Sequence, residues 1–195
     1  MSTDDPTRPD DTPDDCPDRT LRLPPGDRTL RGKLQEGRDL RFAKLRGVDM
    51  TGADFYWALF HNAELEEAIM ARCDLRGATL NEANLRRADL TSANCGLDNL
   101  GGSTDFIKAD LSGADLHNAD IGGADFTDAR LIGANLSGAS AQSQFNDRPT
   151  KFLGADLTGA RLEGARLAGA LYDAHTVFPR GFKPDRAGMV LKTRA

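Results

Sequence analysis

Apolar residues recur at every fifth position along most of the chain, and polar residues separate them. The centres of this pattern are mainly Leu, Phe, Met and Ile, and they form three runs: Leu45 to Leu100, Phe106 to Leu136, and Leu157 to Tyr172. Ala usually stands two positions before a centre, Asp or Asn often stands directly before it, and Gly often follows two positions later. One extra residue in the Gly101–Gly102 region separates the first two runs.

A five-residue period fits neither an α-helix nor a straight strand. Five residues rotate the side chain around a helix axis, and they reverse its face on a strand. The centres share one interior only if the backbone turns a corner in every repeat, and Gly suits such a corner because it lacks a Cβ. Four right-angle corners close a coil of about 20 residues, and such coils must stack to bury their apolar side chains. The pattern predicts an all-β solenoid of about six square coils spaced about 4.8 Å apart.

The segment KADLSGADLHNADIGGADF, residues 108–126, resembles the pentapeptide-repeat family, whose pattern is Ala-Asp/Asn-Leu-X-X. The resemblance implies a right-handed quadrilateral β-helix. The segment after Leu171 is also similar to one that follows the last coil in such proteins. By this resemblance it would cap the core with Tyr172, Phe178, Phe182 and Met189.

Composition divides the chain into five parts. Residues 1–20 are rich in Asp and Pro and are expected to be a disordered acidic tail. Residues 21–40 are expected to form an N-terminal cap, and residues 41–172 the β-helix. Residues 137–152 break the period and are predicted to be a loop inserted in it. Residues 173–195 are expected to form the C-terminal cap and tail.

Charge narrows the choice of partners. The formal net charge is -5, and residues 1–20 carry all of it, because they contain seven Asp and two Arg. The rest of the chain is balanced, which argues against direct nucleic-acid binding. No apolar run is long enough to span a membrane. The N-terminus does not resemble a secretory signal and the three cysteines are widely spaced, so we expect a cytoplasmic protein.

The first candidate partner-binding surface is acidic. It contains seven outward carboxylates: Asp54, Asp74, Asp105, Asp110, Asp115, Asp120 and Asp125. With one extra residue near 101, stacking would align one column as Asp54, Asp74, Asn94, Asp115 and Asn135. Such rows could imitate DNA phosphates. Alternatively, Asp or Asn before the centre is only the structural preference of the family, and the banding of charge along the chain favours this interpretation.

The second candidate is an aromatic cluster expected to face outward: Tyr56, Trp57, Leu59 and His61. Exposed apolar patches often mark contacts. Alternatively, the N-terminal cap folds over these side chains and buries them.

The third candidate is the 137–152 loop, with Phe145, Arg148 and Lys151 as contacting residues. Loops that interrupt a regular scaffold are natural contact points. Alternatively, the loop is a neutral insertion, since added loop length costs little free energy.

The sequence offers no catalytic constellation, because the three histidines are far apart and no metal-ligand spacing occurs. We therefore expect no enzyme, cofactor or metal. The first hypothesis is a protein-binding scaffold, either a monomer or a homodimer. The alternative comes from the family resemblance. Its best-understood members mimic DNA and protect DNA gyrase or another type II topoisomerase from poisons, as in antibiotic self-resistance.

Overall fold

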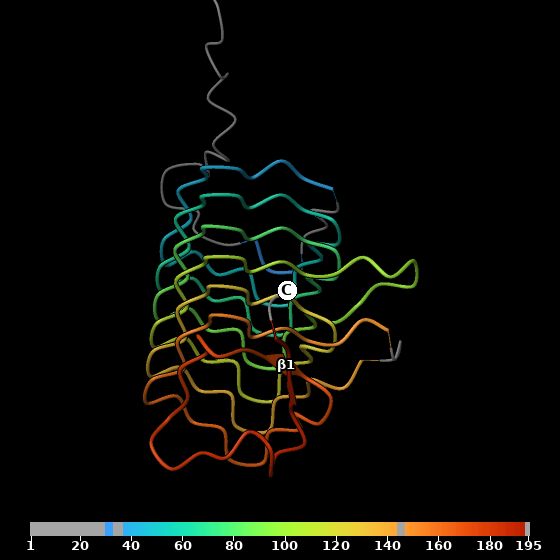
Figure 1. The fold of residues 1–195 in the computed structure, drawn as a ribbon. Helices are drawn as coiled ribbons and strands as arrows, with labels where there is room; N and C mark the ends of the chain where they lie inside the picture. The colour runs from blue at the N-terminus through green and yellow to red at the C-terminus, as the bar shows by residue number, and fades with distance from the viewer. Residues whose placement is uncertain (1–29, 33–36, 144–146, 194–195) are drawn as a thin grey trace, which may run out of the picture.

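The computed structural model describes residues 30–32, 37–143 and 147–193. Over these residues the chain winds into a stack of four-sided coils, with the first coils at one end and the last at the other (Figure 1). Each side of a coil joins the same side of the next coil through an isolated parallel bridge. The described residues contain no helix, and their one extended pairing is parallel, between β1 (Leu171–Tyr172) and β2 (Val190–Leu191).

The bridges form four series, which define four faces of the stack. The first face carries Asp39, Leu59, Thr79, Asp105, Asp125, Lys151 and Leu171. The second carries Lys44, Glu64, Asn84, Asp110, Arg130, Asp156 and Val177. The third carries Asp49, Ile69, Asp89, Asp115, Asn135 and Arg161. The fourth carries Asp54, Asp74, Asn94, Asp120, Ser140 and Arg166.

Each repeat places one large and one small apolar side chain inside the tube. Leu111 and Ala114 are both fully buried. The Leu111 N–H donates to Arg130 O in the next coil at 2.7 Å, and the Ala114 N–H donates back to Leu111 O across the corner at 3.0 Å. The corner between them lies at Gly113, whose φ of 70° is a left-handed conformation that glycine adopts at little cost. Burial of each large centre stabilises the fold by about 1.5–3 kcal/mol.

Two insertions interrupt the coils, and both differ from the sequence prediction. Bridged residues are normally 20 positions apart, but Thr79 pairs with Asp105 and Asp125 pairs with Lys151, both 26 apart. Each insertion therefore adds six residues. The prediction of a single extra residue near 101 is wrong. Leu100, taken as an inward centre, is instead 84% exposed, because the chain leaves the tube after Cys95.

The second departure from the coil is narrower than the predicted 137–152 loop. Ser140 still bridges to Arg166, and Ala141 is buried. Thr150 is already buried again, and Lys151 bridges to Asp125. The segment outside the coil therefore lies between Ala141 and Thr150.

The chain after the last coil packs against the end of the core. The rings of Tyr172 and Phe178 lie 5.5 Å apart, those of Phe178 and Phe182 lie 5.2 Å apart, and Met189 is buried. At the other end, Leu30 and Leu40 are buried, whereas residues 1–29 and 33–36, including most of the expected N-terminal cap, lie outside the described residues. None of the described segments is a helix capable of crossing a bilayer.

Candidate functional site

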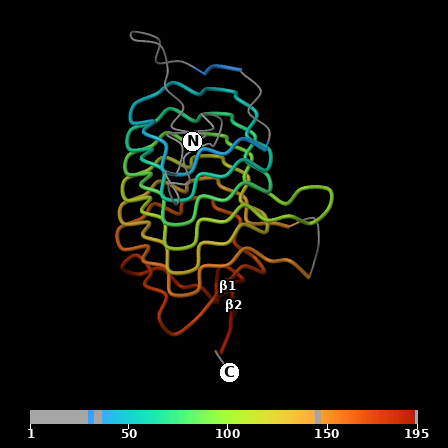
Figure 2. The ribbon, with the colours of Figure 1, turned by 90° about the horizontal axis from the view of Figure 1, so that it is seen from above.

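Both insertions leave the tube at the same corner, between its fourth and first faces. One regular corner, Ile121–Ala124, lies between them in the stack. Figures 1 and 2 show the two loops projecting from the same side of the molecule. We call this surface the two-loop edge and define it as residues 96–104, 142–143 and 147–149 together with Tyr56 and Trp57.

Asp98 organises the first loop from within. Its side chain is buried, and Oδ1 accepts the backbone N–H groups of Leu100 at 2.8 Å and Gly102 at 2.6 Å. The Tyr56 hydroxyl donates to Oδ2 at 3.2 Å. Burial opposes ionisation of Asp98, but these hydrogen bonds and one from the Trp57 side chain outweigh it and hold the Asp98 pKa below its usual value. An ionised carboxylate therefore fixes the loop to the aromatic pair.

Trp57 supports the loop by lying against two glycines. A Cβ added at Gly102 would stand 2.8 Å from Trp57 Cζ2, and one added at Gly77 would stand 3.0 Å from Trp57 Cε2. Trp57 keeps 45% of its surface exposed. A loop more than forty residues downstream therefore covers part of the Trp57 ring. The alternative that the N-terminal cap buries the cluster concerns residues that lie mostly outside the described ones.

Of the other two members of the predicted aromatic cluster, Leu59 lies on the first face beside this edge, and His61 lies at the next corner, between the first and second faces. Leu59 is 37% exposed and His61 is partly exposed. The sequence reasoning missed Asp98. The sequence feature that could have indicated it is the spacing of eleven residues between Cys95 and Phe106, where five or a multiple of five is expected. This segment contains an Asp followed by Gly101 and Gly102.

The second loop is fastened to the first. Arg148 Nη1 donates to Gly101 O, although the Arg148 side chain is itself exposed. Leu97 of the first loop packs on Gly123, where an added Cβ would come within 2.4 Å of Leu97 Cγ. The buried Thr150 hydroxyl accepts the Gly123 N–H at 2.9 Å and lies 2.8 Å from Ile121 O. The two loops and the corner between them therefore form one packed unit.

The remaining predicted loop residues fall elsewhere. Lys151 lies on the first face, where Nζ forms an ion pair with Asp125 Oδ2 at 2.8 Å. Phe145 lies outside the described residues. A small pocket of about 60 Å³ lies where the two loops leave the tube, and its lining includes Leu97, Asp120 and Gln142. It is far smaller than the roughly 300–1,000 Å³ typical of small-molecule sites.

The predicted acidic columns change because of the insertions. The column that begins with Asp54 and Asp74 continues through Asn94 to Asp120 and Ser140, whereas Asp115 belongs to the third face. The sequence prediction counted the six inserted residues as one repeat plus one extra residue. Every later residue was therefore assigned to the neighbouring face of the tube. Asp105 and Asp125 do bridge one another on the first face.

Most of these carboxylates brace corners of the tube. Six of the seven accept the backbone N–H two residues later, at 2.9–3.2 Å: Asp54, Asp74, Asp110, Asp115, Asp120 and Asp125. Asp105 instead accepts the Ser103 hydroxyl at 2.6 Å, and burial raises its pKa. The pattern supports the structural interpretation of this position.

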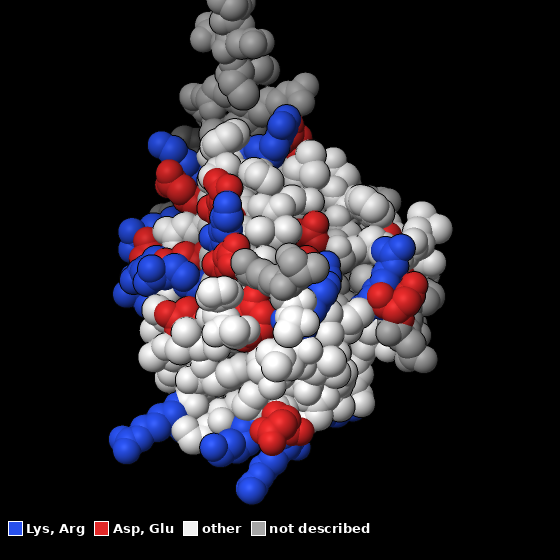
Figure 3. Space-filling view, viewed as in Figure 1, with Lys and Arg blue, Asp and Glu red and all other residues white. Residues whose placement is uncertain are grey.

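Cations also neutralise several of them. Asp74 pairs with Arg76 at 2.5 Å, and Asp110 pairs with Arg86 at 3.2 Å. Burial opposes ionisation of Asp110, but the Ser112 and Arg86 hydrogen bonds hold its pKa below its usual value. In the charged areas of the face shown in Figure 3, acidic and basic side chains lie next to one another. The seven predicted carboxylates therefore do not form a continuous row of negative charge.

The cysteines that the structure describes are core residues. Cys73 Sγ lies 2.9 Å from Met50 O, and burial raises the Cys73 pKa to about 12. Cys95 is fully buried, and burial raises its pKa as well. Over residues 30–32, 37–143 and 147–193, no group of three His, Cys, Asp or Glu side chains could hold a metal ion.

The family match and the similar solved structures both indicate the same protein family. The family described as pentapeptide repeats matches in eight copies, over residues 39–77, 68–96, 103–142 and 150–171. The unmatched gaps, 97–102 and 143–149, coincide with the two loops. None of the curated proteins matches.

Several solved pentapeptide-repeat structures are similar. HetL, a protein involved in heterocyst differentiation regulation in the cyanobacterium Nostoc sp. strain PCC 7120, is 30% identical over 84% of this chain and 72% of its own, with a TM-score of 0.53. Alr5209 from Nostoc PCC 7120 is 33% identical over 69% of this chain and 84% of its own, with a TM-score of 0.25. QnrB1, a plasmid-mediated fluoroquinolone resistance protein, is 21% identical over 85% of this chain and 86% of its own, with a TM-score of 0.42.

Proposed function

This chain belongs to the pentapeptide-repeat family, and on that premise we propose that it is a non-catalytic protein-binding scaffold that docks its partner through the two-loop edge. One observation carries the proposal. The two departures from the regular coil emerge at one corner: Asp98 braces the first loop, Leu97 packs it on the corner between the loops, and Arg148 of the second loop bonds to Gly101 of the first. A neutral insertion needs no such internal bonding, because loop length alone costs little free energy.

The edge offers the side chains that protein interfaces favour. Leu100 is 84% exposed and Trp57 is 45% exposed, and Arg148 also faces solvent. Trp and Arg are enriched among residues that dominate binding energy. Leu59, 37% exposed on the adjoining face, extends this partly apolar area. The tube holds these groups in a fixed arrangement, which lowers the entropy lost on binding.

The alternative, mimicry of DNA toward gyrase, is less well supported. It requires ordered rows of available negative charge. Here Asp74, Asp110 and Asp125 are ion-paired, and all three also accept the backbone N–H of a corner. The carboxylates therefore have a structural role that needs no partner.

A photo-crosslinking experiment tests the proposal. Benzoylphenylalanine replaces Leu100 in one full-length variant and Thr158, an exposed corner residue on the second face, in the control. In extracts of the native host, the Leu100 position should form a discrete covalent product that the Thr158 position does not. The same product should weaken when Arg148→Ala loosens the edge. Identical products from both positions, or no product at Leu100, would contradict the proposal.

A supercoiling assay with purified gyrase, with and without a poison, separates the two functions. We expect no inhibition and no protection on titration with this chain. Protection would instead support the DNA-mimic alternative.

The architecture proposed with this function is a tube of about six coils with caps at both ends. Phe178 and Phe182, which pack against the core, support the cap at the end of the last coil. Most of the proposed N-terminal cap lies outside the described residues. We further propose a cytoplasmic location.

A further inference from the structure

Two sides of the last coil, on the third and fourth faces, have no bridge to a further strand among the described residues, and the third is the less covered, because Leu162 is partly buried whereas Leu167 is buried. In the coil above, the third face is fully bonded: the Leu136 N–H donates to Arg161 O at 2.8 Å, and the Gly138 N–H donates to Glu163 O at 2.9 Å. The equivalent N–H groups of Leu162 and Gly164 have no hydrogen-bond partner among the described residues. The segment after the coil forms its hydrogen bonds elsewhere: Val177 O accepts the Leu157 N–H on the second face, and Gly188 O accepts the Gly169 N–H. The third face therefore ends in an open strand edge.

Burial follows the same pattern. The large centres above Leu162 on this face are fully buried: Met50, Met70, Leu90, Leu116 and Leu136. Leu162 is only partly buried, and so is Ala165 at the next small inward position. An apolar side chain that belongs to the core is thus left partly uncovered, directly beside unpaired backbone groups. Both deficits would be removed by one more strand.

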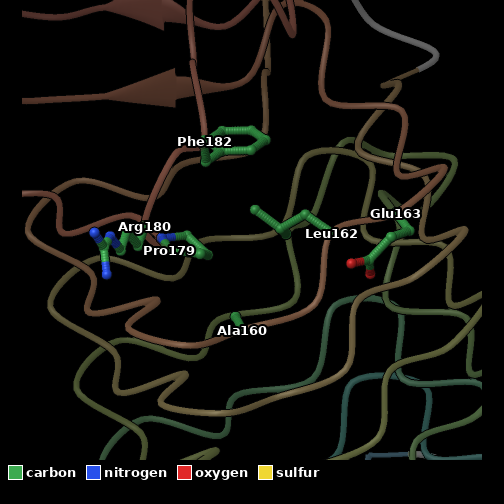
Figure 4. A pocket seen from close by; sticks show the side chains of 6 residues that line it. All are labelled: Ala160, Leu162, Glu163, Pro179, Arg180 and Phe182. Atoms are coloured by element: carbon green, nitrogen blue, oxygen red, sulfur yellow. The ribbon is translucent and has the colours of Figure 1, made fainter.

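A pocket lies beside this edge. It is a hollow of about 280 Å³, widely open to solvent and lined by Ala160, Leu162, Glu163, Pro179, Arg180 and Phe182. Figure 4 shows Leu162 between Glu163 on one side and the Pro179–Arg180 segment on the other, with the Phe182 ring opposite Ala160. The pocket is slightly smaller than typical small-molecule sites. It suits an apolar side chain of an added strand.

The charge around the pocket favours an acidic occupant. Basic residues outnumber acidic ones in the last part of the described chain, residues 161–193, which contains Arg161, Arg166, Arg180, Lys183, Arg186 and Lys192 against Glu163, Asp173 and Asp185. Blue side chains project from this end of the molecule in Figure 3, with acidic atoms between them. Basic surfaces attract acidic segments over about a Debye length, roughly 8–10 Å at ordinary ionic strength.

The chain itself contains a segment of matching chemistry. Residues 1–20 hold seven Asp and two Arg, and Leu21-Arg22-Leu23 follows. In an extended strand Leu21 and Leu23 point to one face and Arg22 to the other. The leucines would meet the pocket and Leu162, while the aspartates would lie near the basic end. Strand addition to an open edge is a common mode of recognition.

This segment cannot reach the edge of its own tube. Leu30 and Leu162 both lie on the third face and are separated by six coil-to-coil steps, through Met50, Met70, Leu90, Leu116 and Leu136. At about 4.8 Å per step the separation is about 29 Å. The seven residues from Leu23 to Leu30 span at most about 25 Å when fully extended. The donor strand must therefore come from another molecule.

We propose that the open third-face edge of the last coil binds the Leu21-Arg22-Leu23 segment of a second copy of this chain. The contact joins the N-terminal segment of one molecule to the C-terminal end of the next. Because the two surfaces differ, the contact is heterologous, and it extends into chains unless a ring closes. It is separate from the two-loop edge, which stays free in such an assembly.

Sedimentation velocity of the full-length protein tests this proposal. The wild type should associate to species larger than dimers as its concentration rises from about 1 µM to about 500 µM, the range in which a contact with few anchors is populated. NaCl at about 1 M, which shortens the Debye length to about 3 Å, should weaken the association. A wild type that stays monomeric throughout would overturn the proposal.

Two variants divide the contact into its halves. Leu21→Asp with Leu23→Asp removes the donor, whereas Leu162→Asp removes the acceptor. Each alone should remain monomeric, and an equimolar mixture should form dimers and nothing larger, because one donor and one acceptor survive. A mixture that stays monomeric, or a donor variant that associates like the wild type, would refute it. Leu191→Asp, at an exposed apolar residue of the same end, should associate normally.

Discussion

Replacing Asp98 by Ala should release the first loop from the tube. The carboxylate accepts two backbone N–H groups, at 2.8 and 2.6 Å, and the Tyr56 hydroxyl at 3.2 Å. A hydrogen bond to a charged group contributes about 1.5–3 kcal/mol, so the two backbone bonds alone stabilise the closed loop by about 3–6 kcal/mol. Local structure at a surface is held by less than the global free energy of unfolding, so a loss of this size should open the loop while the coils stay folded.

Trp57 reports this opening directly, because the loop covers part of its ring and it is the chain's one tryptophan. Its emission in Asp98→Ala should shift to longer wavelength and become more accessible to a quencher, while the far-ultraviolet circular dichroism remains unchanged. Asp89→Ala, at a corner away from Trp57, is the matched control. Asp89 accepts one backbone N–H, that of Thr91, at a half-exposed corner, so its loss should cost only about 0.5–1.5 kcal/mol of global stability. Identical emission and quenching in the two variants would refute the assigned role of Asp98.

Three further predictions concern pH, a corner and a misassigned centre. The pKa of Asp98 is lower in the folded protein than its unfolded value near 4, so its ionised form stabilises the loop at neutral pH, and this stabilisation should be lost as pH falls from about 4 through the folded pKa. Tryptophan emission should be constant above that range and change below it. The Asp98→Asn variant should not show this change in emission. Gly123→Ala should lower the free energy of urea unfolding by about 1–3 kcal/mol more than Gly133→Ala, because both have positive φ but only the first would meet a loop side chain; equal losses would argue against packing of the loop on this corner. In the same assay, Leu111→Ala should lower the free energy of unfolding by about 2–5 kcal/mol and Leu100→Ala by less than about 0.5 kcal/mol. A large decrease in Leu100→Ala would indicate that Leu100 is a core residue after all.

The sequence was sufficient for the tube because the core obeys a local rule. Leu111, Leu116 and Ile121 each follow a corner by the same number of residues, so one repeat predicts the burial of the next. The family resemblance is confirmed by the match over most of the repeats.

The same periodicity misled where the chain left the tube. Leu100 stands five residues after Cys95 and so satisfied the pattern, yet it lies in an inserted loop. A six-residue insertion is one repeat plus one residue, and reading it as a repeat rotates every later side chain by one face. The acidic columns were therefore assembled from residues of different faces, such as Asp74 and Asp115.

The two-loop edge was only partly accessible to sequence reasoning. The exposure of Trp57 and Arg148 could be anticipated from their positions. Their partners could not, because Asp98 and Gly101 come close to them only after the coils stack in the correct register. Contacts between residues more than forty positions apart depend on the length of each insertion, which the repeat pattern alone does not fix.

Amide hydrogen exchange of the full-length protein is the most direct test that the two loops form one built surface. The N–H groups of Asp98, Leu100, Gly101 and Gly102 all donate hydrogen bonds within the first loop. We predict slow exchange in peptides covering residues 97–103, and faster exchange there in Arg148→Ala, a substitution in the other loop. Exchange at the rate of an open chain in the wild type, or no response to Arg148→Ala, would contradict the account.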